Sequence, residues 1–154
     1  MINSDSENSV RKSILIAQNI ERTFQLWTEQ IRAWWPASHS MSGDPKTQVF
    51  IEAKVGGRFY ERASNGVEYD WGAVELWEPP YRLTFTWYLG TTPELPTRVV
   101  VQFVPLEANK TRIEIEHRGP ELIGKLWPQR EGIFSAAWEN VLSKFAAFLL
   151  CQED

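Results

Sequence analysis

Two stretches with a helical hydrophobic period enclose a long region in which apolar and polar residues alternate. Between Ile20 and Trp35, apolar residues recur every three or four positions, and Pro36 ends the helix that this pattern predicts. The second helical stretch runs from residue 130 to residue 150. Its apolar face is formed by Phe134, Ala137, Trp138, Val141, Leu142, Phe145 and Leu149.

The remaining pattern predicts a series of strands. Leu83, Phe85 and Trp87 alternate with polar residues, as expected for a sheet that packs one face and exposes the other. Asn65-Gly66 is typical of a hairpin turn, and the prolines at 79 and 80 indicate a sheet corner. The strands are expected at 11–17, 49–54, 58–63, 69–77, 82–88, 97–104 and 111–117. This order of strand, helix, strands and helix predicts an α+β fold with helices on one face of an antiparallel sheet.

Length and charge limit the classes of protein to consider. The chain has 154 residues, which suits one domain, expected over residues 11–150 after a disordered segment at 1–10. The net charge of -4 and the absence of a Lys/Arg stripe argue against nucleic-acid binding. A lone Cys151, no signal peptide and no obvious bilayer-spanning stretch lead us to expect a cytoplasmic protein without membrane insertion.

Tryptophan is the unusual component, with 8 residues. Several stand at or near the ends of predicted strands, as Trp71 and Trp87 do. Such large rings have to pack against something apolar. They predict either a filled core or a cavity, and this choice decides the function.

Six short motifs, taken together, resemble the SRPBCC superfamily, also called START or Bet v 1-like. Within it, the chain is similar to the bacterial group named after the activator of Hsp90 ATPase, over roughly residues 11–150. The motifs are Trp34-Trp35-Pro36, Val55-Gly56-Gly57-Arg58-Phe59, Trp71-Gly72-Ala73-Val74, the segment 79–87, the segment 111–119, and Trp138. The chain departs from the pattern at Pro120, where close relatives often carry an aromatic residue.

The resemblance implies a helix-grip fold, in which a curved antiparallel sheet wraps around the long C-terminal helix. It also implies an apolar cavity between the two that holds a hydrophobic or aromatic small molecule. By this analogy the cavity walls are expected to be Trp71, Phe85, Trp87, Phe103, Ile115, Phe134 and Trp138, with Asp70 and His117 as polar contacts. No cofactor is expected.

Asp70 and His117 leave an alternative open. If strand parity is unbroken, Asp70 lies on the face of Gly72, and the two side chains could serve as acid and base in a cyclase or hydratase. They could equally form a buried pair, or Gly72 could mark a bulge that reverses the parity before it. Glu61, in phase with Phe59, is a further inward carboxylate.

A third hypothesis is a co-chaperone-like interaction module with an exposed apolar patch. An internal void above roughly 300 Å³ would favour ligand binding or catalysis, whereas a filled core would leave only the interaction module. His39 lies in a Ser-rich loop and is expected in solvent, and Trp127 is either part of a lid or packed on the sheet. The spacing of His and Cys predicts no metal site. Edge strands could pair the chain into a homodimer.

Overall fold

A seven-stranded antiparallel sheet with the order β1-β7-β6-β5-β4-β3-β2 forms the centre of the computed structural model, which describes residues 9–89, 91–119 and 123–151. The predicted antiparallel α+β architecture is confirmed. The strands are β1 (Ser9–Ile16), β2 (Gln48–Ile51), β3 (Arg58–Arg62), β4 (Glu68–Glu78), β5 (Arg82–Trp87), β6 (Thr97–Glu107) and β7 (Lys110–Arg118).

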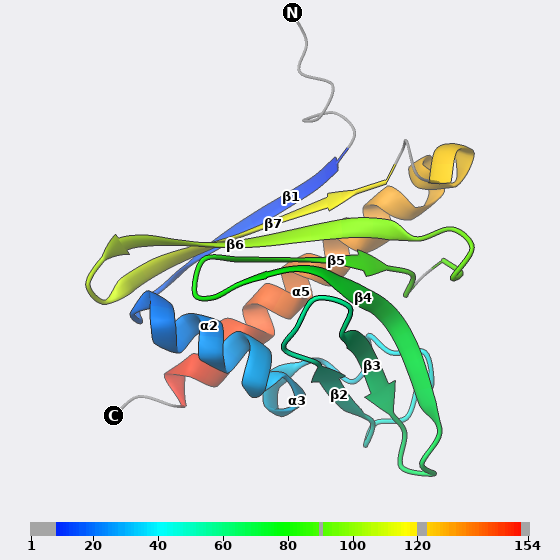
Figure 1. Ribbon diagram of the computed structural model, residues 1–154, viewed down its shortest axis with the longest axis horizontal. Coiled ribbons are helices and arrows are strands. Elements are labelled where there is room, and N and C mark those ends of the chain that lie inside the picture. Colours follow the sequence, from blue (N-terminus) through cyan, green and yellow to red (C-terminus); the bar gives the residue numbers. More distant parts are fainter. Residues whose placement is uncertain (1–8, 90, 120–122, 152–154) are drawn as a thin grey trace, which may run out of the picture.

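The helices lie on one side of this curled sheet (Figure 1). They are α2 (Ile20–Glu29), α3 (Ile31–Trp34), a 3-10 turn η1 (Gly124–Leu126) and α5 (Trp127–Leu150). The long helix α5 crosses the sheet diagonally, and α2 and α3 lie beside its C-terminal half (Figure 1). The sheet therefore grips α5, which is the predicted helix-grip arrangement.

Several predicted boundaries differ from the structure. The first helix is divided at Gln30 into α2 and α3, and the Asn19 side chain caps α2 by accepting a 2.7 Å hydrogen bond from the Arg22 N–H. Strand β1 begins at Ser9, which pairs with Arg118, so residues 9 and 10 belong to the domain. The rest of the predicted disordered segment lies outside the described residues, as does Pro120.

Helix α5 begins three residues earlier than predicted, with Pro128 in its first turn, where a missing N–H costs nothing. Together with η1 it is long and apolar enough, by length and composition alone, to cross a membrane. Here its face of Phe134, Trp138, Val141, Leu142 and Phe145 is buried in the fold. We therefore interpret it as the core helix that the sheet encloses.

Strand β4 contains a bulge, the alternative that the sequence left open at Gly72. Phe59 pairs with Gly72 but Tyr60 pairs with Asp70, so Trp71 is an extra residue on β4. The strand approaches its neighbour so closely that a Cβ on Gly72 would lie 1.8 Å from the Thr86 carbonyl oxygen. The bulge reverses the parity of β4, which sends Trp71 inward and Asp70 outward.

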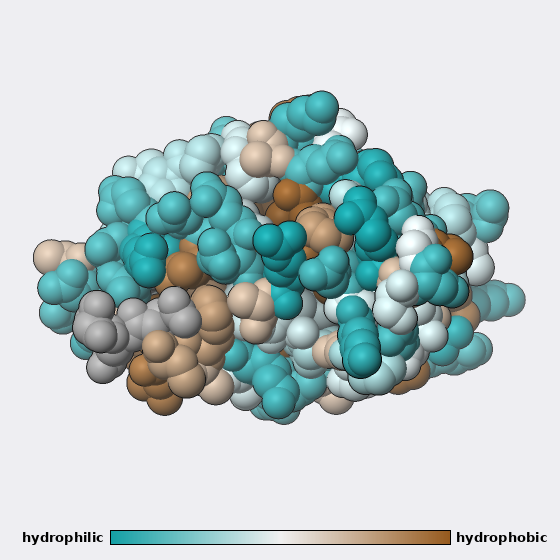
Figure 2. Space-filling model, turned by 90° about the horizontal axis from the view of Figure 1, so that it is seen from below, coloured by the Kyte–Doolittle hydropathy of each residue, from teal (hydrophilic) through white to brown (hydrophobic). Residues whose placement is uncertain are grey.

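Aromatic rings fill most of the space between sheet and helices. Trp27, Trp71, Phe59, Phe85, Phe103 and Phe145 are all at most 2% exposed. Their centroids lie 5–6 Å from neighbouring rings, as in the Trp27–Phe145 contact of 5.1 Å and the Phe59–Phe85 contact of 5.0 Å. These spacings are those of direct ring contact. The face shown in Figure 2 is largely hydrophilic, with small separate hydrophobic patches.

Candidate functional site

An open hollow of about 220 Å³ lies between α5, the end of β5 and the segment that follows α3. Its wall is aromatic and aliphatic on the side of the helix and the sheet, and polar on the side of the segment 38–40. The lining residues are Trp35, Ser38, His39, Ser40, Trp87, Leu89, Ile133, Phe134, Ala137, Trp138 and Val141.

Three indole rings gather at the base of this hollow. Trp35, Trp87 and Trp138 lie with their centroids 5.4–6.0 Å apart, and each ring is more than nine-tenths buried. The Trp35 N–H donates to the backbone oxygen of His39 at 2.9 Å, and the Trp138 N–H donates to His117 Nδ1 at 2.9 Å. With these polar atoms bonded inside the protein, the two rings offer the hollow their apolar surfaces.

His39 forms part of the rim and contacts the helix opposite. Asn140 Nδ2 lies 3.0 Å from His39 Nε2. Because an amide nitrogen can only donate, His39 Nε2 is the acceptor and the ring proton of His39 belongs on Nδ1. Partial burial lowers the pKa of His39 below its ordinary value of 6.5. The prediction that His39 would be solvated is therefore wrong, since its ring is half-buried and spans from the segment 38–40 to α5.

Glu61 fastens the segment that carries His39. Its Oε1 accepts hydrogen bonds from the Met41 N–H at 2.6 Å and the Trp71 N–H at 2.8 Å. Its Oε2 accepts from the Ser42 and Thr47 hydroxyls, both at 2.7 Å. Although burial raises its pKa, these four bonds lower it, and the net pKa lies below the ordinary value of 4.5. The carboxylate is 0% exposed and stays ionised because donors surround it.

His117 is a buried structural residue. It is 0% exposed, and its ring stacks on Phe134 with centroids 4.1 Å apart. Because Nδ1 accepts from Trp138, the proton lies on Nε2 and is donated to Thr97 Oγ1 at 2.6 Å. The Thr97 hydroxyl then donates to the Trp87 carbonyl at 2.9 Å. Burial lowers the pKa of His117 to about 3, so the ring is neutral near pH 7.

Asp70 lies on the outer face of the sheet, away from His117. Its carboxylate is 48% exposed and accepts hydrogen bonds from Arg58 Nη2 at 2.8 Å and Nε at 3.0 Å. The expectation that Asp70 faces the interior is wrong because the bulge at Trp71 reverses the parity. The two predicted polar residues are therefore not brought together.

Of the predicted wall residues, the structure brings Trp87, Phe134 and Trp138 to the hollow. The others belong to the packed core and do not line it: Trp71, Phe85, Phe103 and Ile115. Trp127 packs on the sheet, 4% exposed and so close to Gly119 that a Cβ there would overlap its ring.

The sequence reasoning missed Trp35 and His39. Trp35 continues the apolar spacing of the first predicted helix, four positions after Ile31, so the periodicity gave it no role apart from the core. His39 has no signal in the sequence, because contacts with Trp35 and with Asn140, 101 positions away, bring it to the hollow.

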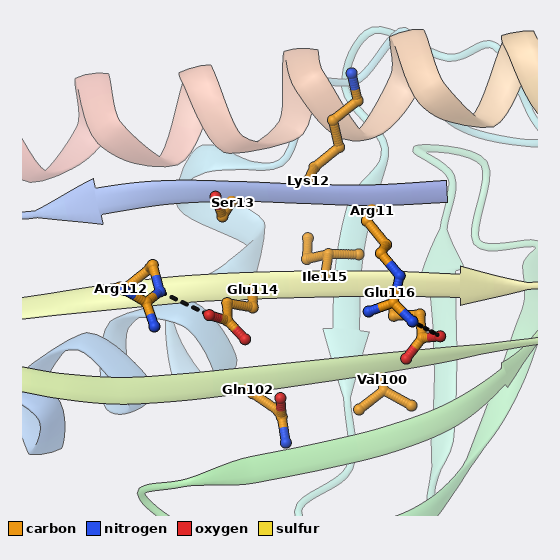
Figure 3. Close-up of a pocket in the computed structure, with 9 residues that line it drawn as sticks. All are labelled: Arg11, Lys12, Ser13, Val100, Gln102, Arg112, Glu114, Ile115 and Glu116. Carbon is orange, nitrogen blue, oxygen red and sulfur yellow. Dashed lines mark hydrogen bonds and ion pairs between the residues drawn. The ribbon is translucent and has the colours of Figure 1, made fainter. Parts of the chain in front are cut away.

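A second hollow, of about 310 Å³, lies on the outer face of β1, β7 and β6 (Figure 3). Its charged side chains are paired, Lys12 with Glu139 of α5 at 3.8 Å and the others with one another. Arg11 pairs with Glu116 at 2.9 Å and Arg112 with Glu114 at 2.6 Å, as the dashed lines in Figure 3 mark. Because these charges are compensated, this surface is that of a solvated sheet face. Within the described residues, no group of three or more His, Cys, Asp or Glu is placed to hold a metal ion.

Comparison with known families assigns the chain. The model of the family "Activator of Hsp90 ATPase homolog 1-like protein" matches residues 17–149. The chain belongs to this family. The AHSA1-like assignment confirms the resemblance derived from the six motifs, and the solved structures below agree with the SRPBCC superfamily. A search of curated proteins found no match.

Solved structures show the same fold for this AHSA1-like chain. A protein of Nitrosomonas europaea is 14% identical, with a TM-score of 0.68 and 99% of both chains covered. A protein of Mesorhizobium loti is 23% identical, with a TM-score of 0.67, covering 95% of this chain and 98% of that one. An anthrahydroquino-gamma-pyrone synthase, Txn09, solved in a complex, is 29% identical, with a TM-score of 0.61 and coverage of 91% and 96%.

Proposed function

We propose that this AHSA1-like chain binds a small hydrophobic or aromatic molecule in the hollow between α5, β5 and the segment 38–40. The observation that carries the proposal is the base of three indole rings, with Phe134 and Ile133 beside it, at the bottom of an open hollow. Ligand sites are concave, mostly apolar and have few polar groups, and this combination describes the hollow.

The size of the hollow limits the ligand. At about 220 Å³ it is smaller than the roughly 300 Å³ set above for an internal void, and the aromatic core beneath it is filled. In the described part of the chain the enclosed cavity expected between sheet and helix is therefore not found, and the proposal rests on the open hollow instead. We therefore propose a ligand of one or two fused rings, or one end of a larger molecule that projects through the open side. The 29% identical relative is described as a synthase of an anthrahydroquino-gamma-pyrone, a polycyclic aromatic compound, and this supports an aromatic ligand class.

The proposal does not assume catalysis. A cyclase or hydratase built on Asp70 and His117 would need the two groups to meet, whereas they lie on opposite faces of the sheet. His117 is also sealed from solvent and holds its proton in a bond to Thr97. Both facts favour binding over acid–base chemistry at these residues.

The test is native mass spectrometry of the purified protein, followed by denaturing extraction and titration with naphthalene. We expect the wild-type protein to hold a small hydrophobic molecule or to bind added naphthalene. Ala137→Phe should abolish binding because a benzyl group there fills the hollow, which Ala137 lines. The matched control is Ala136→Phe, one position along α5 on its exposed side.

The control should bind as the wild type does. A wild-type protein that carries no molecule and does not bind naphthalene would contradict the proposal. Equal binding by Ala137→Phe and the wild type would place the ligand elsewhere.

Two exposed leucines favour a second candidate, self-association through the edge strand β1. Leu15 is 59% exposed and Leu150 is 72% exposed, and both line an apolar groove between β1 and the end of α5. A second copy of the chain could cover this groove, which corresponds to the homodimer expected from the edge strands. We expect sedimentation to show a concentration-dependent dimer in the wild type and a monomer in Leu150→Glu. A wild-type monomer at all concentrations would contradict this candidate.

A further inference from the structure

The polar side chains around the hollow all come from one short segment. Ser38, His39 and Ser40 lie on that side, whereas the residues of β5 and α5 that line it are aromatic or aliphatic. A ligand that fills the hollow therefore meets apolar surface on most sides and polar groups along one edge.

Two ring nitrogens of residues that line the hollow have no hydrogen bond to any described residue. The Trp35 N–H donates to the His39 backbone oxygen, and the Trp138 N–H donates to His117 Nδ1. The N–H of the third indole, Trp87, has no partner among the described residues. The sealed, unpartnered polar atoms of the described chain are Thr91 Oγ1, Trp127 Nε1 and Arg130 Nε. Because Trp87 Nε1 is not one of these, it is not sealed in the interior, and Trp87 itself lines the hollow.

The second such nitrogen is Nδ1 of His39. Its neighbour Nε2 accepts from Asn140, and Nδ1, which carries the proton in this tautomer, has no partner in the described part of the chain. The contact with Asn140 also fixes the ring against α5, and the Trp35 bond to the His39 backbone oxygen fixes its main chain. The nitrogen is thus held in place as a free donor.

Both nitrogens are donors, so the complementary ligand group is an acceptor. Among the described residues, no carboxylate, amide, Lys or Arg side chain lines the hollow, and burial lowers the pKa of its one imidazole, His39, so charged ligand groups have no fixed counter-charge there. From these observations, and on the basis of the binding function proposed above, we infer that the hollow selects aromatic molecules with an oxygen acceptor, such as a ring carbonyl, on one edge. His39 and Trp87 are the specificity-determining residues.

The test compares 1-tetralone with tetralin, two bicyclic molecules that differ by one carbonyl oxygen. Dissociation constants are measured by ¹H–¹⁵N NMR titration, which also reads the indole N–H signals of the bound protein. The quantity of interest is the ratio of the dissociation constant of tetralin to that of 1-tetralone, because the ratio removes effects that are common to both molecules.

We expect His39→Leu and Trp87→Phe each to lower this ratio by about fivefold to tenfold, the effect of losing one neutral hydrogen bond. The Trp87 indole signal, assigned by its absence in Trp87→Phe, should move downfield with 1-tetralone and not with tetralin. The matched control is Ile133→Ala, on the apolar side of the hollow and 55% exposed. It should weaken the binding of both molecules by the same factor and leave the ratio of their dissociation constants unchanged.

An unchanged ratio in both His39→Leu and Trp87→Phe, with both molecules still bound, would overturn this inference and leave the proposed binding function intact. Failure of the wild-type protein to bind either molecule would overturn the binding function itself. The folded ¹H–¹⁵N spectrum of each variant separates these results from loss of structure.

Discussion

Two buried polar residues, Glu61 and His117, illustrate how single side chains are stabilised in this aromatic interior. Each is 0% exposed, and each has every polar atom bonded. Burying a polar group without partners would cost about 1–3 kcal/mol, so complete bonding is what allows them there. They differ in charge state, because donors surround the Glu61 carboxylate and keep it ionised, whereas burial lowers the pKa of His117 and keeps its ring neutral.

Two substitutions of Glu61 test whether its four hydrogen bonds offset the cost of its burial. In Glu61→Gln, the amide oxygen can still accept from Met41 and Trp71, and the Ser42 and Thr47 hydroxyls can reverse to accept from the amide N–H groups. We expect it to cost about 1 kcal/mol or less in the free energy of unfolding, and Glu61→Ala about 3 kcal/mol. Urea denaturation measures both. Equal losses would contradict the role of the four bonds.

The pKa of Glu61 gives a prediction in acid. Because its folded pKa lies below the unfolded value of about 4.5, its stabilisation is fully present above that value and is lost as the pH falls through the folded pKa. We expect Glu61→Gln to lose less stability than the wild type between pH 5 and pH 3. Urea midpoints across this range measure it, and parallel curves would contradict it.

His117 should make the free energy of unfolding depend on pH in a higher range than Glu61 does. The unfolded chain takes up a proton at His117 below about 6.5, whereas the folded chain does so only near 3. Stability should therefore fall with pH below 6.5, by up to about 1.4 kcal/mol per pH unit. His117→Gln cannot titrate in this window but can accept from Trp138 and donate to Thr97, and it should show a shallower dependence.

The measurement is the free energy of unfolding at pH 7, 6 and 5, where Glu61 is mostly ionised in both states. His39 also has a lowered pKa, so His39→Leu is the control that separates the two histidines. If His117→Gln kept the wild-type slope while His39→Leu lost it, the assignment to His117 would be wrong.

At the scale of single elements, the bulge in β4 has the largest consequences. It turns Trp71 inward, where its N–H reaches Glu61, and places Asp70 beside Arg58 on the outer face. Gly72 allows β4 to approach β5 this closely, because the Thr86 backbone leaves no room for a side chain at position 72. The extra residue in β4, Trp71, thus both bonds Glu61, which holds the segment 38–42, and places Asp70 on the outer face of the sheet.

Gly72→Ala should therefore destabilise the protein by more than about 3 kcal/mol, since the strands have to separate to admit a Cβ. Gly132, in α5, is the matched control because a Cβ there meets nothing within 4 Å. Gly132→Ala should stabilise the protein by about 0.5–1 kcal/mol through helix propensity. Thermal and urea denaturation measure both, and a mild effect of Gly72→Ala would show that β4 and β5 can separate at little cost.

At the scale of the whole molecule, the hollow is assembled from three segments that are distant in the sequence. Trp35 and His39 follow α3, Trp87 ends β5, and Trp138 belongs to α5. Glu61 on β3 and Asn140 on α5 each fasten the segment that carries His39. A ligand in the hollow would contact all three segments at once and would therefore stabilise the folded chain as a unit.

This gives a whole-molecule prediction that rests on the proposed function. With 1-tetralone at ten times its dissociation constant, the free energy of unfolding should rise by about 1.4 kcal/mol. The increase should be absent in Ala137→Phe and present in Ala136→Phe. Urea denaturation with and without the compound measures it, and an equal increase in Ala137→Phe would contradict binding at this hollow.

The sequence by itself determined the elements, their order and the family, because these depend on local periodicity, turn residues and short motifs. It also indicated that Trp87, Phe134 and Trp138 face inward, since unbroken alternation on β5 and helical spacing on α5 are local properties. Whether the aromatic interior is filled could not be derived in this way. Packing depends on how rings from distant elements interlock.

Only the tertiary structure decided the positions of Asp70 and His39 and the role of His117. A bulge is a matter of strand register, so no spacing rule could give the parity of Asp70. His39 reaches the hollow through contacts with residues far away in the sequence. His117 is neutral because burial lowers its pKa, and Trp138 and Thr97, on two other elements, fix its tautomer. These features arise from long-range contacts, which form only when the sheet closes around α5.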